Sequence, residues 1–235
     1  VSLKTAPIGS PIRNRLKATS LPIERFFTQA GADVLASASY ARATSKIKDT
    51  EGKTVFEMKD VEVPADWSQL AVDILVSKSF RKAGVPAKLS NGTGHEISVR
   101  QVVKRIAHTL RVEGETKGYF DAEAAATFEA ELSYILVNQY GAFNSPVWFN
   151  LGLYHEYGIE GSGGNFAHDP IVNHAVETKN AYERPQCSAC FIQSVNDDLM
   201  SIFDLIKNEA RLFKYGSGTG TNFSRVRGKQ EKLSG

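Results

Sequence analysis

The stretch from residue 190 to residue 226 constrains the fold more than any other part of the chain. Residues 190–195 form a short apolar run that is typical of a strand. Asn196 and Asp197 then turn the chain and can cap the helix that follows. A glycine-rich turn and a second strand at 222–226 come after that helix. Strand, helix and strand in this order predict an α/β unit with parallel strands. The apolar residues of the predicted helix share one face: Leu199, Ile202, Phe203, Ile206, Ala210 and Phe213.

The earlier part of the chain predicts a hairpin and then helices. Polarity alternates at 46–48 and 54–58 around a turn that contains Gly52, which indicates a β-hairpin that Pro64 ends. We expect a mobile basic tail at 1–20, a hairpin and helical region at 21–140, and the start of a larger α/β domain at 141–235, where residues 141–187 lose periodicity.

Three amphipathic helices are predicted within that helical region. They run over about 67–80, from Ser98, where Gln101 completes a capping box, and from about Asp121. The first of them places these residues on one face: Trp67, Leu70, Ala71, Ile74 and Leu75.

Composition excludes several classes of protein. The chain has 235 residues, 42% of them hydrophobic, which is ordinary for a globular protein. Its 28 Lys and Arg against 26 Asp and Glu give a net charge of +2, so charge makes no case for nucleic acid or an anionic membrane as a partner. The chain contains no apolar run of about 18 residues, the length that a membrane span needs. Two cysteines are too few for a disulfide scaffold.

The two cysteines form a CxxC pair, Cys187 and Cys190, with several interpretations. A structural zinc site needs four ligands, and the five histidines show no compact ligand spacing with this pair, so we assign no metal ligand. A thioredoxin-like motif would open a helix, whereas Cys190 opens a predicted strand. Two reduced structural thiols, or a single redox cysteine at 190 with a distant partner, also fit the pattern.

Three alternating glycines follow the predicted helix, in Gly216-Ser217-Gly218-Thr219-Gly220-Thr221. Thr221 stands where a dinucleotide fingerprint needs glycine, and no P-loop lysine is present. A helix C-cap explains Gly216 but not the other two. The permissive backbone instead indicates a turn that an anion or another ligand approaches closely.

A third segment, 144–150 (Asn-Ser-Pro-Val-Trp-Phe-Asn), is either a buried turn with a capping serine or the polar lining of a pocket. Together with Ala189-Cys190-Phe191-Ile192-Gln193-Ser194-Val195, Asp197-Asp198-Leu199, the run from Glu209 to Asn222 and Arg227-Gly228, it resembles the catalytic chain of ribonucleotide reductases. The likeness is greatest to the adenosylcobalamin-dependent class II enzymes and covers most of the chain from about residue 20.

This resemblance implies a fold and a chemistry. The fold would be α/β, a helical N-terminal region with a β-hairpin followed by the first part of a ten-stranded α/β barrel. The activity would be radical reduction of a ribonucleoside diphosphate or triphosphate at its 2′-OH. The adenosylcobalamin cofactor would generate the radical. A cysteine pair would supply the electrons, and a thioredoxin-like dithiol would reduce the pair again.

The resemblance also implies roles for individual residues. Cys190 matches the first cysteine of the reducing pair. The substrate pocket would include Cys190 together with Ser145, Ala189 and Gly218. The allosteric site for dNTP or ATP effectors, at a homodimer interface, would include Asp197, Asp198, Leu199 and Arg227. Cys187 has no expected role in the reaction.

The other catalytic groups of the family, among them the thiyl cysteine and the second reducing cysteine, do not fit into a chain with two cysteines. We therefore expect a piece of a longer cytoplasmic protein, inactive by itself. Two alternatives remain: a class I large subunit, whose radical comes from a separate metal protein, and a non-catalytic nucleotide-binding or CxxC metal module.

Overall fold

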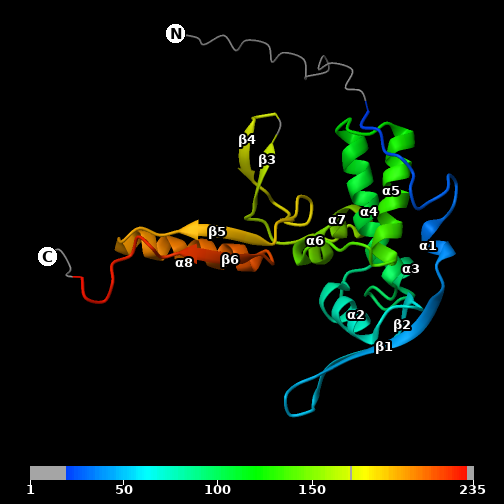
Figure 1. Ribbon diagram of the computed structural model, residues 1–235, viewed down its shortest axis with the longest axis horizontal. Helices are drawn as coiled ribbons and strands as arrows, with labels where there is room; N and C mark the ends of the chain where they lie inside the picture. Colours follow the sequence, from blue (N-terminus) through cyan, green and yellow to red (C-terminus); the bar gives the residue numbers. More distant parts are fainter. Residues whose placement is uncertain (1–19, 170, 232–235) are drawn as a thin grey trace, which may run out of the picture.

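The computed structural model describes residues 20–169 and 171–231, so the expected tail, apart from Ser20, lies outside the described residues. Figure 1 shows a body around two long helices and an arm that extends away from it. We call residues 34–157 the body and residues 190–222 the arm. The body contains α1 (Val34–Ser37), β1 (Tyr40–Lys48), β2 (Thr54–Pro64), α2 (Gln69–Ile74), the π-helical turn η1 (Leu75–Ser79), α3 (Ala87–Ser90), α4 (Val99–Thr116), α5 (Ala122–Val137), α6 (Ser145–Asn150) and α7 (Leu153–Tyr157). The hairpin β3 (Phe166–Asp169) and β4 (His174–Glu177) precedes the arm, which contains β5 (Cys190–Ser194), α8 (Leu199–Lys214) and β6 (Gly218–Asn222).

The helices α4 and α5 begin where the sequence predicts. The Ser98 hydroxyl accepts the N–H of Arg100 at 3.1 Å, and the Gln101 side chain accepts the N–H of Ser98 at 3.1 Å, which confirms the capping box. Asp121 caps α5 by accepting the N–H of Ala124 at 2.8 Å. The core of the body lies between these helices, the hairpin and α2, and its most buried members are Val61, Val72, Val76, Val99, Val102, Val103, Ile106 and Val137.

The predicted hairpin is confirmed, with longer strands: β1 and β2 pair antiparallel from Tyr40 opposite Pro64 to Lys48 opposite Thr54. The face predicted for helix 67–80 is correct only in part. Trp67 and Leu75 pack in the core as predicted, whereas Leu70 and Ile74 are exposed. Val72 and Val76, which are not on the predicted face, are buried. Both faces of this helix are apolar, so periodicity alone does not choose between them. Packing against the hairpin decides.

The arm is a parallel βαβ unit, as predicted: Cys190 pairs with Gly218 and Ser194 with Asn222 in parallel register. The second strand nevertheless lies at Gly218–Asn222 and not at 222–226, because the alternating glycines are themselves the strand. Within 216–222 only Gly216, just after the helix, has a positive φ, at 84°. The helix cap is Asp198, which accepts the N–H of Ser201 at 2.9 Å, and not Asn196 or Asp197.

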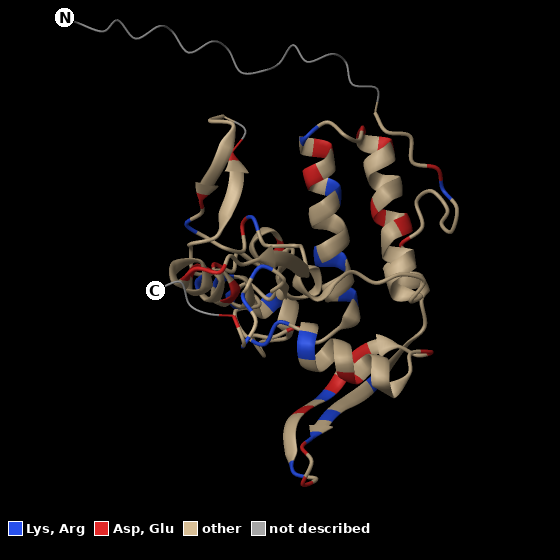
Figure 2. Ribbon diagram, turned by 60° about the vertical axis from the view of Figure 1, so that its left-hand side comes forward, with Lys and Arg blue, Asp and Glu red and all other residues tan. Residues whose placement is uncertain are grey.

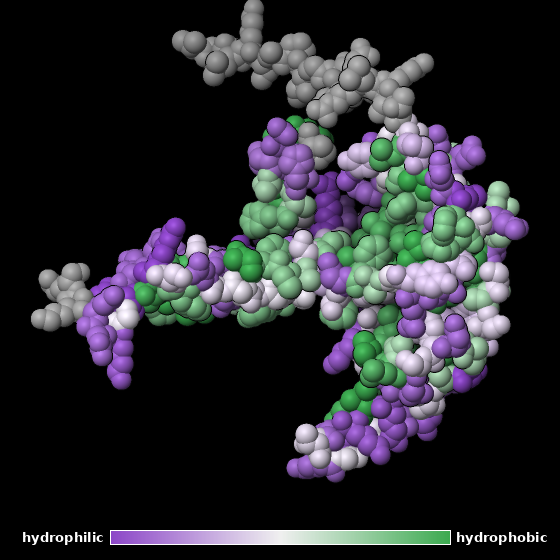
Figure 3. All heavy atoms as spheres, in the orientation of Figure 1, coloured by the Kyte–Doolittle hydropathy of each residue, from purple (hydrophilic) through white to green (hydrophobic). Residues whose placement is uncertain are grey.

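The apolar face predicted for α8 is largely exposed. Leu199 is 66% exposed and Phe213 is 59% exposed, and Phe203 and Ile206 are similar. Only Leu205 of this helix is buried. Figure 3 shows hydrophobic surface along the arm.

Acidic and basic residues are interspersed along α4 and along the β1–β2 hairpin (Figure 2), in keeping with the small net charge. Across the described residues the strands form three two-stranded sheets, so the mixed helix and strand content is as expected and no barrel is closed. In the same residues no helix has the length and apolar character needed to cross a membrane.

Candidate active site

Cys190 stands on the open face of the arm. Along β5 exposure alternates: Cys190, Ile192 and Ser194 are exposed, whereas Phe191 and Gln193 are half-buried. Alternate strand residues point to opposite faces. Thr219 and Thr221 of the paired strand bond to Glu209 of α8, so α8 covers the face of their β5 partners, Phe191 and Gln193. The thiol is therefore on the face away from α8.

The glycines of β6 lie beside this thiol. Gly218 pairs with Cys190 and Gly220 with Ile192, so both glycines share the open face. A Cβ placed on Gly218 would have only the Ala189 carbonyl oxygen near it, at 3.5 Å. The space next to Cys190 is thus free of side chains from β6. This geometry supports the expected close approach of a ligand to the glycine backbone.

The start of β6 is tied to the segment before Cys190. The Gly218 N–H donates to the Ala189 carbonyl at 2.5 Å, and the Ser217 hydroxyl donates to the Ser188 carbonyl at 2.6 Å. Ala189, Cys190 and Gly218 are therefore three predicted pocket residues that the structure brings together.

Ser145, the fourth predicted pocket residue, is exposed at the first position of α6. The cap of this helix is Asn144, whose side chain accepts the N–H of Val147 at 3.4 Å. Contact with the arm is made at the other end of α6, where the Asn150 amide donates to the Tyr215 carbonyl at 3.5 Å. The C-terminal end of α6 therefore lies against the arm, and Ser145 lies at the opposite end of this helix.

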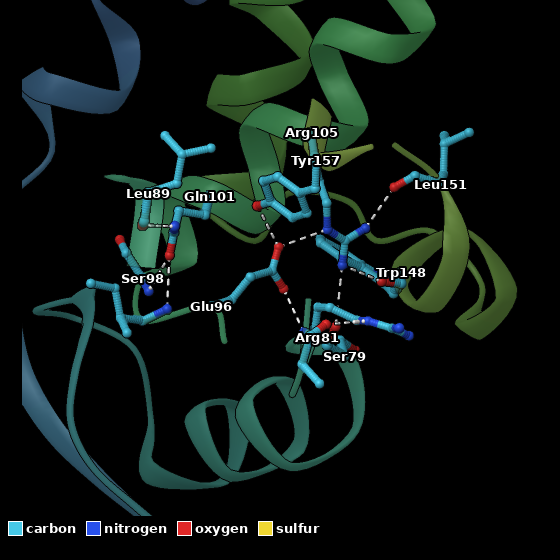
Figure 4. A network of polar contacts seen from close by, with 12 residues as sticks. Ser79, Arg81, Leu89, Glu96, Ser98, Gln101, Arg105, Trp148, Leu151 and Tyr157 are labelled. Carbon is cyan, nitrogen blue, oxygen red and sulfur yellow. Dashed lines mark hydrogen bonds and ion pairs between the residues drawn. The ribbon is translucent and has the colours of Figure 1, made fainter. Parts of the chain in front are cut away.

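A buried arginine holds the C-terminal end of α6 (Figure 4). Arg105 of α4 donates to the carbonyls of Trp148 and Leu151, each at 2.7 Å, and to that of Ser79 at 3.2 Å. Its Nε pairs with the Glu96 carboxylate at 2.8 Å, and both side chains are fully buried. The last carbonyls of a helix lack partners within the helix, and here the guanidinium supplies them.

Glu96 uses its remaining acceptor sites on two further segments. It accepts the N–H of Arg81 at 2.7 Å and the Tyr157 hydroxyl at 2.8 Å. Burial, and then the neighbouring Glu96 carboxylate, raise the pKa of Tyr157 well above its usual value, so this hydroxyl remains a donor. The buried charges are thus fully partnered, as low-dielectric surroundings require.

The predicted effector residues gather beyond the other end of β5. Asp197 and Arg227 form an ion pair with 2.5 Å between the carboxylate and Nε. Asp198 caps α8, and Leu199 is its exposed first residue. Arg227 binds Asp197 through Nε, and its terminal nitrogens make no hydrogen bond to the other described residues, so they can donate to an oxyanion such as a phosphate group.

Cys187 differs from Cys190. It is half-buried against the core, and burial raises the pKa of its thiol. Both cysteines are free. A buried thiol of raised pKa is a poor nucleophile, which agrees with the expectation that Cys187 takes no part in the reaction.

We tested whether the described residues fit a cobalamin or a metal ion. Cavities of about 420 Å³ and 330 Å³ lie between α1, α4 and α5 and between α6 and the end of α8. Pockets for drug-sized ligands already measure about 300–1,000 Å³, and a corrinoid is much larger than such a ligand, so neither cavity fits it. Within residues 20–169 and 171–231, no group of three or more His, Cys, Asp or Glu side chains is arranged to hold a metal.

Comparison with known proteins identifies the family. Residues 40–139 match the family model described as class II vitamin B12-dependent ribonucleotide reductase, and residues 188–235 match that of the ribonucleotide reductase barrel domain. The chain is 45% identical to the vitamin B12-dependent ribonucleotide reductase of Agrobacterium fabrum, over 91% of this chain and 19% of that protein. The chain belongs to the class II ribonucleotide reductase family.

Two further relatives support the same family assignment. The vitamin B12-dependent enzymes of Bradyrhizobium diazoefficiens and Rhodopirellula baltica are each 44% identical, over 91% and 90% of this chain and 20% of each relative. The chain thus spans about a fifth of the length of these curated relatives. The resemblance inferred from the motifs is confirmed, and vitamin B12 dependence is the stated property of these relatives.

Sequence reasoning missed three polar residues that organise the site region. Glu96 and Arg105 hold α6, and Glu209 of α8 accepts hydrogen bonds from β6. A charged residue at an inward position of a helix was the available signal for Arg105, because the buried valines at 102 and 103 and Ile106 surround it in sequence.

Proposed function

We propose that the complete gene product that carries this chain reduces ribonucleotides to 2′-deoxyribonucleotides, with Cys190 as one of its two reducing thiols. The observation that carries the proposal is the exposed thiol of Cys190 beside the bare glycine face of β6. In the reaction the 2′-OH leaves as water and a hydrogen takes its place at C2′. Two thiols lose two electrons and two protons and form one disulfide, which a thioredoxin-like dithiol then reduces.

In this proposal the substrate lies over Gly218, with its phosphate toward Ser145 and Ala189 at the edge of the pocket. The dNTP or ATP effector binds where Asp197, Asp198 and Leu199 meet Arg227. Two copies of the chain form the expected homodimer. The ten-stranded barrel and a cytoplasmic location are parts of the same proposal.

We further propose adenosylcobalamin as the cofactor, which would supply the initial radical when bound. The described cavities do not fit it, so we assign none of these residues to the corrinoid and derive no step through it. Residues 1–235 by themselves would be inactive, because two cysteines cannot provide both a reducing pair and a thiyl radical.

The test uses the complete gene product with a dithiol, with and without adenosylcobalamin. We expect deoxyribonucleotide formation that needs the cobalamin and is lost in Cys190→Ser. Cys187→Ser is the matched control, and we expect it to remain active. Activity without cobalamin would favour a class I enzyme. No reduction under either condition, or an active Cys190→Ser variant, would contradict the proposal.

A further inference from the structure

The strand β6 is held to α8 by a single carboxylate. Glu209, half-buried on α8, accepts the hydroxyl of Thr219 at 2.9 Å and that of Thr221 at 3.0 Å, both on the same oxygen, Oε1. The two threonines lie two residues apart and therefore share the face of β6 that α8 covers. Gly218 and Gly220 consequently face the other way, toward the side of Cys190.

A strand of this composition needs such a restraint. Glycine weakens a strand, because it adds backbone freedom and has no side chain to pack. Glycine-rich strands also have weakly specified register. On the open face of β6, Gly218 and Gly220 have no side chains that could resist sliding of the strand along β5.

The consequence of sliding is specific. A shift of one residue in the β5–β6 pairing would turn the threonines to the open face. A threonine side chain would then stand beside Cys190, in the space that the glycines leave free. The bonds from Gly218 to Ala189 and from Ser217 to Ser188 fix the start of β6, whereas Glu209 acts along its length.

From this geometry we propose that Glu209 is a positioning residue for substrate binding: it holds β6 in the register that keeps the glycine face beside Cys190. The inference rests on the proposed function, because it assigns the space over Gly218 to the ribonucleotide. Glu209 itself touches neither Cys190 nor that space. It acts through Thr219 and Thr221.

The test compares four variants of the complete gene product. Glu209→Ala removes the acceptor, and Glu209→Gln retains an amide oxygen that can accept both hydroxyls. Thr219→Val with Thr221→Val removes the donors but keeps β-branched side chains. Asn208→Ala changes an exposed neighbour on α8 and is the matched control. Hydrogen exchange in residues 217–223 reports on the strand, and KM and kcat for ribonucleotide reduction report on the site.

We expect Glu209→Ala, which removes the acceptor of both threonine hydroxyls, to raise KM about tenfold with little change in kcat. Exchange in 217–223 should also become about tenfold faster, at the lower end of the effect of losing hydrogen bonds to a charged group. The double valine variant should show the same changes in KM and exchange, and it provides the test if Glu209→Ala does not fold. Glu209→Gln should stay near the wild type, and Asn208→Ala should equal it. Unchanged KM in both Glu209→Ala and the double valine variant would overturn the proposal, with or without faster exchange. Absence of ribonucleotide reduction in the wild type would instead overturn the proposed function, and unchanged exchange in Glu209→Ala would then separately overturn the register role.

Discussion

The body and the arm differ in the burial of their polar groups and in the space around their glycines. In the body, the buried Arg105 and Glu96 use their polar atoms on each other and on segments of the same chain. In the arm, Cys190 is exposed, and the glycines of β6 leave the space beside it open. The glycines differ likewise: a Cβ on Gly152 of the body would lie 2.4 Å from the Arg105 carbonyl oxygen, whereas one on Gly218 would meet nothing closer than 3.5 Å.

This difference separates residues that stabilise the fold from residues that are available to bind a ligand or to react. A group whose hydrogen bonds are all satisfied within the chain contributes to stability and to the placement of neighbours. A thiol or a backbone edge that the chain leaves open can meet a ligand. Changes in the body should therefore affect unfolding, and changes on the open face of the arm should affect binding.

The largest effect is expected for Arg105→Met. It leaves the Glu96 carboxylate buried without its partner and frees the carbonyls of Trp148 and Leu151. Breaking a buried ion pair costs about 3–5 kcal/mol. We expect a loss of that size in the opening free energy of α4, measured by hydrogen exchange in the complete gene product.

Two comparisons test the cause of that loss. Lys104→Met changes the exposed neighbour on α4 and should have no effect on exchange. Adding Glu96→Leu to Arg105→Met removes the unpaired charge and should recover part of the stability. Equal stability of the Arg105→Met and Lys104→Met variants would contradict the assigned role of the network.

The next effect is expected for Gly152→Ala. Gly152 has φ of 82°, and its missing Cβ makes room for the Arg105 backbone. Backbone strain and overpacking together predict a loss of about 3 kcal/mol in the body. Hydrogen exchange of α4 and α7 measures it, and unchanged protection there would show that the contact relaxes without cost.

A smaller, pH-dependent effect is expected at Glu131 of α5. Burial acts to raise the pKa of this carboxyl, but hydrogen bonds from the Thr28 hydroxyl at 2.6 Å and from the N–H groups of Phe27 and Thr28 outweigh it and lower the pKa. A lowered folded-state pKa means that the stabilisation is complete above the unfolded value of about 4.3 and is lost as pH falls through the folded value.

We therefore expect the segment around Phe27 and Thr28 to lose protection from exchange on acidification below the unfolded pKa of about 4.3, as Glu131 becomes protonated and its hydrogen bonds weaken. Glu131→Gln should show reduced protection at neutral pH and little further change with acid. Hydrogen exchange over residues 24–30 of the complete gene product provides the measurement, and equal pH profiles in the two proteins would refute the role of this carboxylate.

The smallest effect on stability is expected for Gly218→Ala. Its new Cβ enters open space and the residue has no positive φ, so the free energy of unfolding should change by about 0.5 kcal/mol or less. In the proposed function the same methyl group occupies substrate space and should raise KM for the ribonucleotide. A large loss of stability with unchanged KM would reverse the comparison between Gly152 and Gly218.

Local signals in the sequence were sufficient for several elements. The capping box at Ser98 and Gln101 and the aspartate cap at 121 define helix starts through side chains that are adjacent in sequence. The parallel βαβ order of the arm was also predictable. The CxxC pattern left a redox thiol at Cys190 as one of several interpretations, and only the family resemblance selected it.

Long-range contacts explain what the sequence did not predict. The buried face of helix 67–80 depends on the distant hairpin, and Arg105 meets carbonyls more than 40 residues away. The glycines at 218 and 220 were assigned to a turn because glycine usually marks turns. Their actual role in a strand follows from the pairing with Cys190 and Ile192, which local pattern does not contain.

The most direct test of the central claim follows the Cys190 thiol through one turnover. The complete gene product is fully reduced, freed of external dithiol and given ribonucleotide with adenosylcobalamin, and Cys190 is then alkylated and mapped by mass spectrometry. We predict that Cys190 becomes resistant to alkylation in proportion to the deoxyribonucleotide formed and reacts again after addition of dithiol. Product formation while Cys190 still reacts fully with the alkylating reagent would contradict its role as a reducing thiol.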